Sequence, residues 1–324
     1  MRILHQSCHL IGQTPCDPTD MAKLIEQAGR TCYKSESKIT DDSSVGFVQR
    51  MIKSGHHSVL EHSNIVFKVA LDVYNDDELI IMLGERMAFH QIEVVGNEYV
   101  YINGNLRAWI DTFKDQIAKA SLLYDMHYLF EVTFGFLFGA DHSGVTPSVA
   151  GINVVMDEHE IPIRLRKYMT RHITNRAMTH EMVRHRIDSA YSQESQRYVA
   201  NDENINFIIP IWADDLVPSS INTNILNKKE TGIWLNSMEA FEKVYHALRS
   251  IGLKPQQCRE VLPNSCKTEI VTTRGFEAWI WFFHLRNDKA ADPQMMDLAG
   301  GTMIQFLNTI NDFKCYYKNN NKSK

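Results

Sequence analysis

The sequence predicts a globular protein of mixed helices and strands, of the α+β or α/β class. Segments with helical spacing of apolar residues alternate along the chain with short segments typical of strands. The 324 residues, 44% of them hydrophobic, can form the core of one elaborate domain or of two ordinary ones. No apolar run approaches the roughly 20 residues of a membrane-spanning helix, and the N-terminus lacks a signal-peptide pattern. We therefore expect a cytoplasmic protein.

Two helices and a strand are predicted near the N-terminus. Apolar residues at helical spacing predict a helix over residues 17–34, which we expect to cover a sheet. A shorter helical pattern runs over residues 47–54 and ends at Gly55, and residues 65–71 alternate in the manner of a strand. The polar segment 56–62 lies between them.

The sequence changes character over residues 72–160. This stretch contains a predicted apolar helix at residues 79–89, a predicted strand at residues 98–102 and a glycine-bearing aromatic stretch at residues 130–144. We interpret the whole stretch as an insertion or subdomain.

Strands and helices alternate again after the insertion. Residues 161–171 are predicted to form a return strand, residues 175–184 a helix and residues 207–210 the end of a buried strand. A long amphipathic helix is predicted at residues 232–251. The tail, residues 318–324, is rich in asparagine and lysine, and we expect it to be frayed.

One weak internal repeat links the insertion to the rest of the chain. Residues 101–110 align without a gap with residues 271–280, and the two copies share the stretch Ala-Trp-Ile. This similarity raises the hypothesis of a duplication.

Composition narrows the classes of function. The six cysteines are scattered without a C-x-x-C pair, which argues against a zinc ribbon or a disulfide scaffold and favours reduced, structural thiols. The net charge of −5 argues against broad, non-specific binding of nucleic acid, which needs many basic side chains facing phosphates. Any site for an anion must therefore be local.

Residues 171–197 form a basic cluster in this acidic protein. They include five arginines and three histidines but only three acidic residues. A run of charge is most often a solvated face, but here the arginines are followed by serine, glutamine and tyrosine side chains. Guanidinium groups bind phosphate oxygens, hydroxyls and amides bind ribose and base edges, and aromatic rings stack on heterocycles. The cluster therefore predicts a nucleotide pocket.

The order of residues in this cluster is similar to the signature of flavin-dependent thymidylate synthases. Arg-His-Arg at residues 184–186 is followed, after eight residues, by Ser-Gln-Arg-Tyr at residues 195–198. The resemblance covers roughly residues 20–70 and 165–300, and it leaves residues 72–160 without a counterpart. Within it, further blocks recur in the family's order at residues 28–33, 56–62, 259–263, 283–286 and 291–294.

The resemblance implies a fold and an assembly. Members of the family have an α+β protomer with a mixed sheet and long helices, and they form homotetramers in which several chains build each active site. For this sequence we therefore expect a single catalytic domain over residues 1–324, with an insertion at about residues 72–160. We also expect self-association and no membrane or nucleic-acid partner.

The resemblance also implies roles for individual residues, with no metal among the ligands. Arg286 matches the family's arginine that favours ionisation at N3 of uracil, and we expect it to be catalytic, since a fixed cation stabilises a developing anion. FAD is expected to contact His56, Ser58, Glu61, Arg184, His185, Arg186 and Gln193. The substrate dUMP is expected to contact Glu181, Arg184, Gln193, Glu194, Ser195, Gln196, Arg197, Arg259 and Arg286.

The reaction implied by the resemblance converts dUMP to dTMP. Methylenetetrahydrofolate supplies the carbon, and FAD that NADPH has reduced supplies the hydride. This route requires no catalytic cysteine, in agreement with the lack of a recognisable thiol motif. The closest alternative is a related flavoenzyme that forms 5-hydroxymethyl-dUMP or acts on a modified nucleotide.

Two departures from the family pattern lie in the basic cluster. Eight residues separate Arg186 from Ser195 where many members have seven, so we expect a one-residue bulge between Ile187 and Tyr191. Glu181 stands where many members carry glutamine. A carboxylate there repels a phosphate but can accept hydrogen bonds from ring N–H groups.

A third departure concerns the internal repeat. Residues 275–277 read Gly-Phe-Glu where the family has Asn-x-Arg for FAD, whereas residues 105–107 in the insertion read Asn-Leu-Arg. This raises the hypothesis that Asn105 and Arg107 substitute for the missing contacts.

Two alternatives lie outside this class of enzyme. An RNA-binding module built on residues 171–197 is opposed by the acidic total and by the lack of a wider basic stripe. In a metallohydrolase, the spacing of His180 and His185 is unfavourable, because the two lie about 140° apart around a helix and not on one face. The candidate zinc ligands in that reading are His56, His57, Glu61, His62, His180 and Glu181.

Overall fold

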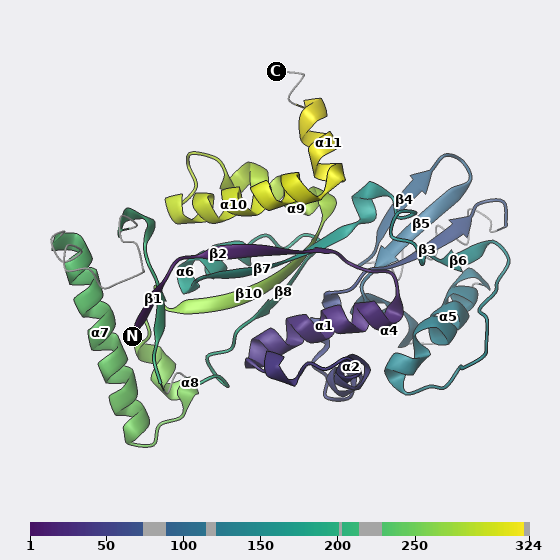
Figure 1. Cartoon of the computed structure of the whole chain (residues 1–324). Helices are drawn as coiled ribbons and strands as arrows, with labels where there is room; N and C mark the ends of the chain where they lie inside the picture. Colours follow the sequence, from purple (N-terminus) through teal and green to yellow (C-terminus); the bar gives the residue numbers. More distant parts are fainter. Residues whose placement is uncertain (74–88, 115–120, 201–202, 214–228, 321–324) are drawn as a thin grey trace.

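The computed structural model describes residues 1–73, 89–114, 121–200, 203–213 and 229–320, and there the chain has the predicted α+β class (Figure 1). The strands are β1 (Arg2–Leu4), β2 (Ser7–Gln13), β3 (Ile65–Ala70), β4 (Gln91–Val95), β5 (Tyr99–Gly104), β6 (Ile152–Val154), β7 (Lys167–Asn175), β8 (Ser189–Gln193), β9 (Asn206–Ile208) and β10 (Lys267–Gly275). The helices are α1 (Pro18–Tyr33), α2 (Ser43–Lys53), α4 (Leu106–Lys114), α5 (Ser121–Phe134), α6 (Arg176–Met182), α7 (Lys229–Ser250), α8 (Pro255–Cys258), α9 (Phe276–Arg286), α10 (Pro293–Thr309) and α11 (Asn311–Asn320).

The strands form two four-stranded sheets and one two-stranded pair. The core sheet has the order β2-β7-β10-β8, and the insertion sheet has the order β4-β5-β3-β6. Both are antiparallel throughout, and among the described residues only β1 and β9 pair in parallel. The expectation of a mixed sheet is therefore wrong for these two sheets. The strands that pair in the core sheet are not consecutive in the chain, and the connections between them reverse the strand direction at each pairing.

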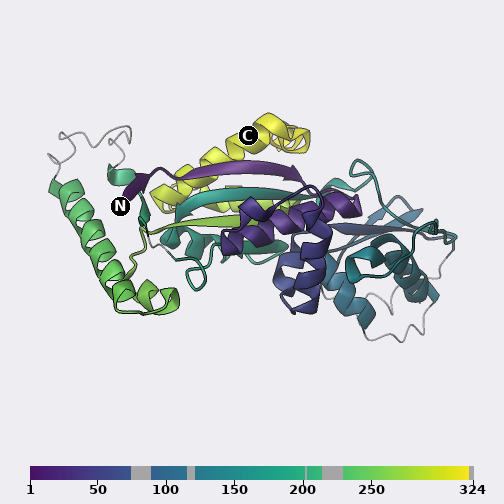
Figure 2. The ribbon, with the colours of Figure 1, turned by 60° about the horizontal axis from the view of Figure 1, so that its bottom comes forward.

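Helices cover both faces of the core sheet. α9 and α10 lie on one face and α1 lies on the other (Figure 1 and Figure 2). Side chains alternate along the strands accordingly: Tyr168 and Ile270 pack under α9 and α10, whereas Met169 and Val271 pack against α1. The helix predicted over residues 17–34 is confirmed as α1, and it covers the sheet as expected.

Residues at both ends of α1 explain its bounds. The Asp17 side chain accepts hydrogen bonds from the backbone N–H groups of Thr19 and Asp20, and Pro18 occupies the first turn. Lys34 adopts a left-handed conformation (φ 49°) and ends the helix. The apolar stripe made α1 predictable from the sequence, and these contacts explain where the helix begins and ends.

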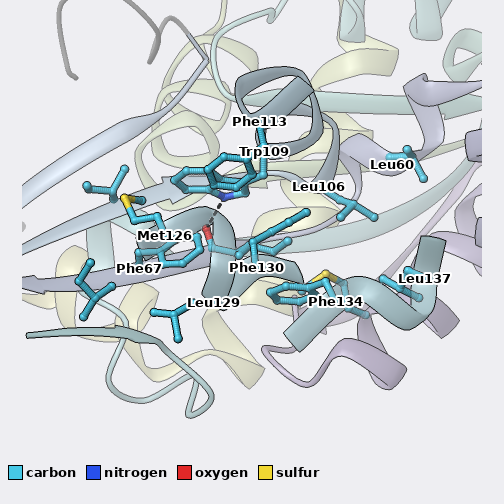
Figure 3. Packing of buried hydrophobic residues seen from close by; sticks show 14 of the residues in the cluster. Leu60, Phe67, Leu106, Trp109, Phe113, Met126, Leu129, Phe130, Phe134 and Leu137 are labelled. Atoms are coloured by element: carbon cyan, nitrogen blue, oxygen red, sulfur yellow. Dashed lines mark hydrogen bonds between the residues drawn. The ribbon is translucent and has the colours of Figure 1, made fainter. Parts of the chain in front are cut away.

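The insertion and the N-terminal helices share one hydrophobic core. Figure 3 shows Trp109 and Phe113 of α4 close to Phe67 of β3 and Phe130 of α5. The same cluster includes Ile25 of α1 and apolar residues of α2. The insertion sheet is thereby fixed to α1 and α2, at the end of the core sheet away from α7 (Figure 1).

The internal repeat of the sequence is also a repeat of structure. In one copy β5 leads into α4, and in the other β10 leads into α9. The indole of Trp109 donates a hydrogen bond to the carbonyl of Ile65 (3.2 Å), and the indole of Trp279 donates one to the carbonyl of Tyr168 (3.0 Å). The two acceptors occupy equivalent places in the β3/β5 and β7/β10 ladders. The structure therefore supports the duplication hypothesis.

Most of the other predicted elements occur with shifted ends. The segments predicted at residues 47–54, 65–71, 98–102, 207–210 and 232–251 correspond to α2, β3, β5, β9 and α7, and the one at residues 175–184 corresponds to α6. α2 begins earlier than predicted because its first turn contains few apolar residues and gives no helical pattern.

The predicted strand at residues 161–171 is wrong in its first half. β7 begins only at Lys167, and Ile163–Leu165 form a turn of 3₁₀ helix. Ile161, Ile163 and Leu165 alternate in the sequence as in a strand, and Ile161 and Leu165 are buried, but the backbone does not have the conformation of a strand.

Three further expectations concern the insertion and the tail. Apart from Phe89, which lies in a turn, the helix predicted at residues 79–89 falls outside the described residues. The aromatic stretch at 130–144 contains the end of α5 and a 3₁₀ turn at Gly135–Phe138. α11 reaches Asn320, and the rest of the tail lies outside the described residues.

No described helix combines the length and apolar content that crossing a membrane requires. All six cysteines are free thiols, as the lack of a C-x-x-C pair led us to expect.

Two buried histidines make the stability of the fold depend on pH. Burial lowers the pKa of both His62 and His172 from 6.5 to about 3. Between those two pKa values the unfolded chain binds protons that the folded chain does not, so stability falls as the pH falls through this window. We expect the free energy of unfolding to decrease by up to about 1.4 kcal/mol per pH unit for each histidine.

Urea unfolding followed by circular dichroism between about pH 7 and about pH 5 measures this slope. Burial opposes the shift, but contacts with Lys267, Lys34 and Arg171 lower the pKa of Glu269 to about 2, so its stabilisation is lost only below this range, as the pH falls from the unfolded value near 4.5 towards 2. His172→Gln should have a shallower slope than the wild type. His159→Gln, at an exposed position, should keep the wild-type slope. Equal slopes in all three proteins would contradict the assignment.

Candidate active site

His62 fixes the segment that carries three of the predicted flavin contacts. Its ring nitrogens hydrogen-bond to Thr273 of β10 (Nδ1 to Oγ1, 2.8 Å) and to Ser192 of β8 (Nε2 to Oγ, 3.0 Å). The lowered pKa keeps this ring neutral, so one nitrogen donates and the other accepts. Because His62 follows the 3₁₀ helix His57–Glu61, the carboxylate of Glu61 is held beside the β8 edge of the core sheet.

A pocket of about 410 Å³ opens between this edge and the insertion. Residues from segments far apart in the sequence line it, and both the core and the insertion contribute charged or amide side chains. They include Glu61, Lys167 and Arg186 from the core, and Asn105, Arg107 and Asp111 from the insertion. Two of the predicted flavin contacts, Glu61 and Arg186, are therefore brought together.

Most charges in the pocket are paired. Arg107 contacts the carboxylates of Glu61 (Nη1 to Oε1, 2.5 Å) and Asp111 (Nε to Oδ2, 3.7 Å). Lys167 pairs with Asp188 (2.9 Å). Arg186 has no carboxylate partner within the part of the chain that the structure describes. Its guanidinium is thus available to a ligand phosphate.

The turn before β8, which contains Ile187 and Asp188, lies at the rim of the pocket. Asp188 has a left-handed conformation (φ 45°), and the side chain of Ile187 before it is 85% exposed. The bulge was expected between Ile187 and Tyr191, but β8 pairs with β10 without a shift of register from Ser189 onward, and the irregular backbone is confined to Asp188. The Asp188 carboxylate turns inward onto Gly275, where a Cβ atom would overlap it.

A second group of predicted residues meets at Arg286, at the C-terminal end of α9. Its guanidinium donates to the carboxylate of Glu181 (Nη1 to Oε2, 2.6 Å) and to the ring of His185 (Nε to Nε2, 2.8 Å). A third contact runs from Nη2 to the backbone carbonyl of Glu181 (3.3 Å). Residues of α6 and of the turn that follows it therefore hold the Arg286 guanidinium in one orientation.

The geometry requires a neutral His185, because its Nε2 accepts a hydrogen bond from Arg286. Burial, together with the positive charges of Arg274 and Arg286, lowers the pKa of His185 to about 4. At neutral pH the acceptor is therefore present. The imidazole also meets the ring of Phe282 edge-on, at 5.1 Å between centroids.

Arg274 and Tyr191 hold the turn after α6 from its buried side. The fully buried Arg274 donates through Nη2 to the carbonyl of Met182 (3.2 Å) and to the Tyr191 hydroxyl (2.9 Å). Its other two nitrogens have no hydrogen-bond partner among the described residues. The rings of Trp279 (4.8 Å) and Phe282 (4.3 Å) lie close to the guanidinium and offset part of the cost of burying it.

A third group of predicted residues lies at the far end of β8. Gln193 donates to the Thr179 hydroxyl (3.0 Å), and Glu194 pairs with Lys267 (2.9 Å). Five residues of β8 at about 3.3 Å each place this group more than about 10 Å from Ser189 in the pocket.

The loop after β8 passes the C-terminal end of α1. The Ser195 N–H donates to the carbonyl of Cys32 (3.0 Å), and Gln196 lies near the Cys266 sulfur (3.7 Å). The Arg197 guanidinium lies over the exposed ring of Tyr198, at 5.2 Å from its centroid. These side chains border solvent and form a separate surface from the pocket.

The remaining predicted residues lie outside the three groups. His56 and Ser58 are exposed on the 56–62 segment, and Arg184 is exposed in the turn after α6. Arg259 lies at the end of α8, with its side chain 40% exposed and Glu260 at 3.7 Å. Within one chain, therefore, the structure does not unite all predicted contacts in one cavity.

Several residues at these sites carry no local signal in the sequence. Lys167, Asp188 and Arg274 take part only because of strand register, which sequence spacing does not reveal. Arg171 of the basic cluster is bound to Glu269, which also binds Lys34 and Lys267, so it supports the sheet and does not face a ligand.

The zinc alternative gains no support from the described residues. The nitrogens of His62 are engaged by Thr273 and Ser192, and Glu181 is engaged by Arg286. No group of three or more histidine, cysteine or acidic side chains within the described part of the chain is arranged to hold a metal ion.

Comparison with known proteins gives one family. The sequence model of the family described as "Thymidylate synthase complementing protein" matches residues 10–76 and 152–309, which is more than half of the chain. The match leaves residues 77–151 uncovered, and these lie within the stretch interpreted from the sequence as an insertion.

Curated relatives bear the name flavin-dependent thymidylate synthase. The protein from Geobacter sulfurreducens is 34% identical over 129 residues, which are 39% of this chain and 49% of the relative. The protein from Mycobacteroides abscessus is 31% identical over 129 residues, with 39% and 51% covered. The protein from Clostridium tetani is 33% identical over 137 residues, with the same coverage. The chain spans about half the length of the curated relatives it matches.

Proposed function

This chain belongs to the thymidylate synthase complementing protein family, and from this we propose that it acts as a flavin-dependent thymidylate synthase. It converts dUMP to dTMP, with methylenetetrahydrofolate as the carbon donor and NADPH as the reductant. The names of the matched relatives support this assignment. The fixed orientation of the Arg286 guanidinium, which can face the pyrimidine, supports it too.

The observation that carries the proposal is the fixed guanidinium of Arg286. Two groups orient it, the Glu181 carboxylate and the neutral His185 ring. A cation held beside uracil stabilises negative charge that develops on N3 and O4, and this raises electron density at C5, where the carbon must attach. Because the fork is already oriented, little reorganisation is needed when the charge develops.

The pocket beside β8 fits one part of FAD. Arg186 offers an unpaired fork for phosphate, and Ser189 offers a hydroxyl. His90 lines the same pocket, and both of its buried ring nitrogens lack a partner among the described residues. In this proposal His56, Ser58, Glu61, Arg184, His185, Arg186 and Gln193 hold the cofactor. The bound flavin supplies the hydride.

The substrate contacts follow the loop after β8. Glu194, Ser195, Gln196 and Arg197 offer hydroxyl, amide and charged groups beside solvent, as a sugar phosphate requires. Arg259 adds a cation from α8. In this proposal these side chains, together with Gln193, Arg184, Glu181 and Arg286, bind dUMP.

We propose that residues 1–324 act as one catalytic domain, with the insertion as part of it, and that copies of the chain complete each other's active sites. The support is that the pocket group and the group after β8 lie at opposite ends of a strand in a single chain. Homotetramers would bring the two groups of different chains together. Light scattering during size-exclusion chromatography measures the assembly, and a monomer that is fully active would contradict it.

The function is tested by visible absorbance and turnover. Purified protein mixed with FAD should retain a yellow flavin after gel filtration, and under anaerobic conditions the rate of NADPH oxidation should respond to dUMP. With methylenetetrahydrofolate added, mass spectrometry of the nucleotide should show dTMP. A colourless protein indifferent to dUMP would overturn the proposal, and 5-hydroxymethyl-dUMP as the product would assign the chain to the related activity.

A further inference from the structure

We propose that the insertion supplies Asn105 and Arg107 as binding residues of the flavin site, in the wall that faces Arg186. The inference rests on the proposed function for the identity of the nucleotide. Two observations support it. The pocket lies between the core sheet and the insertion, and the two copies of the internal repeat differ at the turn between strand and helix.

The turn between β5 and α4 places both side chains at the pocket. The Asn105 Oδ1 atom accepts a hydrogen bond from the backbone N–H of Ala108 (2.9 Å), which caps α4 and leaves the Asn105 amide N–H groups for a ligand. The N–H of Leu106 donates to the Ser63 hydroxyl (2.7 Å), which ties this turn to the segment that carries Glu61. The turn is therefore fixed relative to the core side of the pocket.

Arg107 is oriented by carboxylates at the mouth of the pocket. Its side chain is 44% exposed and lies between Glu61 (2.5 Å) and Asp111 (3.7 Å). The two acidic side chains hold the planar guanidinium in one orientation. Such a fork binds phosphate or ribose oxygens with less loss of side-chain entropy than a free arginine.

The chemistry of the lining favours a nucleotide over a bare anion. Three carboxylates and three cationic side chains face the pocket, so a small phosphate is not attracted by net charge. A nucleotide has hydroxyl and ring N–H donors for the carboxylates as well as phosphate acceptors for the arginines. The side chains of Phe89 (79% exposed) and Ile187 (85% exposed) add apolar surface on either side for a heterocycle.

The equivalent turn of the core copy cannot serve in this way. The position that matches Asn105 is Gly275, where the Asp188 carboxylate occupies the space of a side chain. The position that matches Arg107 is Glu277, which pairs with Arg164 at 2.7 Å on the surface, where both side chains are about 60% exposed. Asp188 thus fills the space beside the turn in the core copy, whereas in the insertion copy the side chains of Asn105 and Arg107 line the pocket.

The test compares matched positions of the repeat in the full-length chain. FAD is titrated into the wild type, Arg107→Ala and Glu277→Ala, and the dissociation constant is read from the quenching of flavin fluorescence. Loss of a charge-assisted contact should weaken FAD binding on the order of 10- to 100-fold in Arg107→Ala. Glu277→Ala, at the equivalent exposed position outside the pocket, should bind FAD as the wild type does.

Two further variants keep the test independent of folding. Asn105→Asp preserves the cap of α4 but places a negative charge at the pocket, so it should weaken FAD while its melting curve stays that of the wild type. Arg107→Lys keeps the charge without the fork and should bind FAD with intermediate affinity. Wild-type affinity in both Arg107→Ala and Asn105→Asp would overturn the inference with the proposed function intact. A wild type that binds no FAD would instead overturn the proposed function.

Discussion

Replacing Arg286 by alanine should lower the rate of dTMP formation on the order of 100- to 1,000-fold while leaving FAD bound. The guanidinium is the cation that Glu181 and His185 hold for the pyrimidine, and alanine removes it at the point where negative charge develops. FAD should remain bound because Arg286 is not among the residues proposed to hold the cofactor and does not line the pocket between β8 and the insertion.

Single-turnover kinetics with reduced enzyme and dUMP measure the effect, and FAD affinity is measured in parallel. Arg164→Ala is the matched control, since Arg164 makes a similar pair with a glutamate at 2.7 Å but lies on the surface. Arg286→Lys should recover only part of the rate, because one ammonium cannot contact both His185 and Glu181 in the same plane. Turnover that survives in Arg286→Ala, or FAD lost in step with turnover, would exclude the assigned role.

Glu181→Gln separates orientation from charge at this site. The amide oxygen still accepts a hydrogen bond from Arg286, and the carboxylate no longer offsets its positive charge, so turnover should stay within a few-fold of the wild type. A loss as large as that of Arg286→Ala would mean that the carboxylate itself takes part in the chemistry.

The elements predictable from the sequence are those whose determinants are local. α1 has an aspartate cap, a proline in its first turn and an apolar stripe, and all three are visible in one stretch of residues. The start of β7 was mispredicted because Ile161 and Leu165 are buried from a 3₁₀ turn and an adjoining loop. Apolar residues alternate there as in a strand, but Ile163 between them is exposed, so the apolar pattern alone does not specify the backbone conformation.

The site shows the same division between local and non-local determinants. The Arg-His-Arg and Ser-Gln-Arg-Tyr motifs are contiguous in sequence, and so their residues could be named without a structure. The pair of Glu181 and Arg286 joins α6 to α9, and the overlap of Asp188 with Gly275 depends on the register of β8 and β10. Such contacts between distant residues carry no spacing rule, which is why they were found only in the fold.

Trp109 and Trp279 should be equally important to stability although they lie in different halves of the molecule. Both are fully buried, and each donates one hydrogen bond to a strand carbonyl in the equivalent place of the repeat. Replacing either by alanine should lower the free energy of unfolding by about 3–5 kcal/mol, from the cavity and the lost contacts. Phenylalanine keeps most of the ring but leaves the carbonyl of Ile65 or Tyr168 without its donor, at a cost of about 1–3 kcal/mol.

Urea unfolding of the four variants measures these losses, and FAD affinity and turnover separate the two halves. Trp109 anchors α4, the helix that carries Arg107, in the core, so Trp109→Phe should weaken FAD binding by displacing the wall of the pocket. Trp279 packs against Arg274 and Phe282, which support His185, so Trp279→Phe should reduce turnover more than FAD affinity. If Trp109→Ala proved harmless to stability while Trp279→Ala did not, the insertion copy would be an appendage to the core. Equal losses would mean that both copies of the duplicated turn are built into the fold.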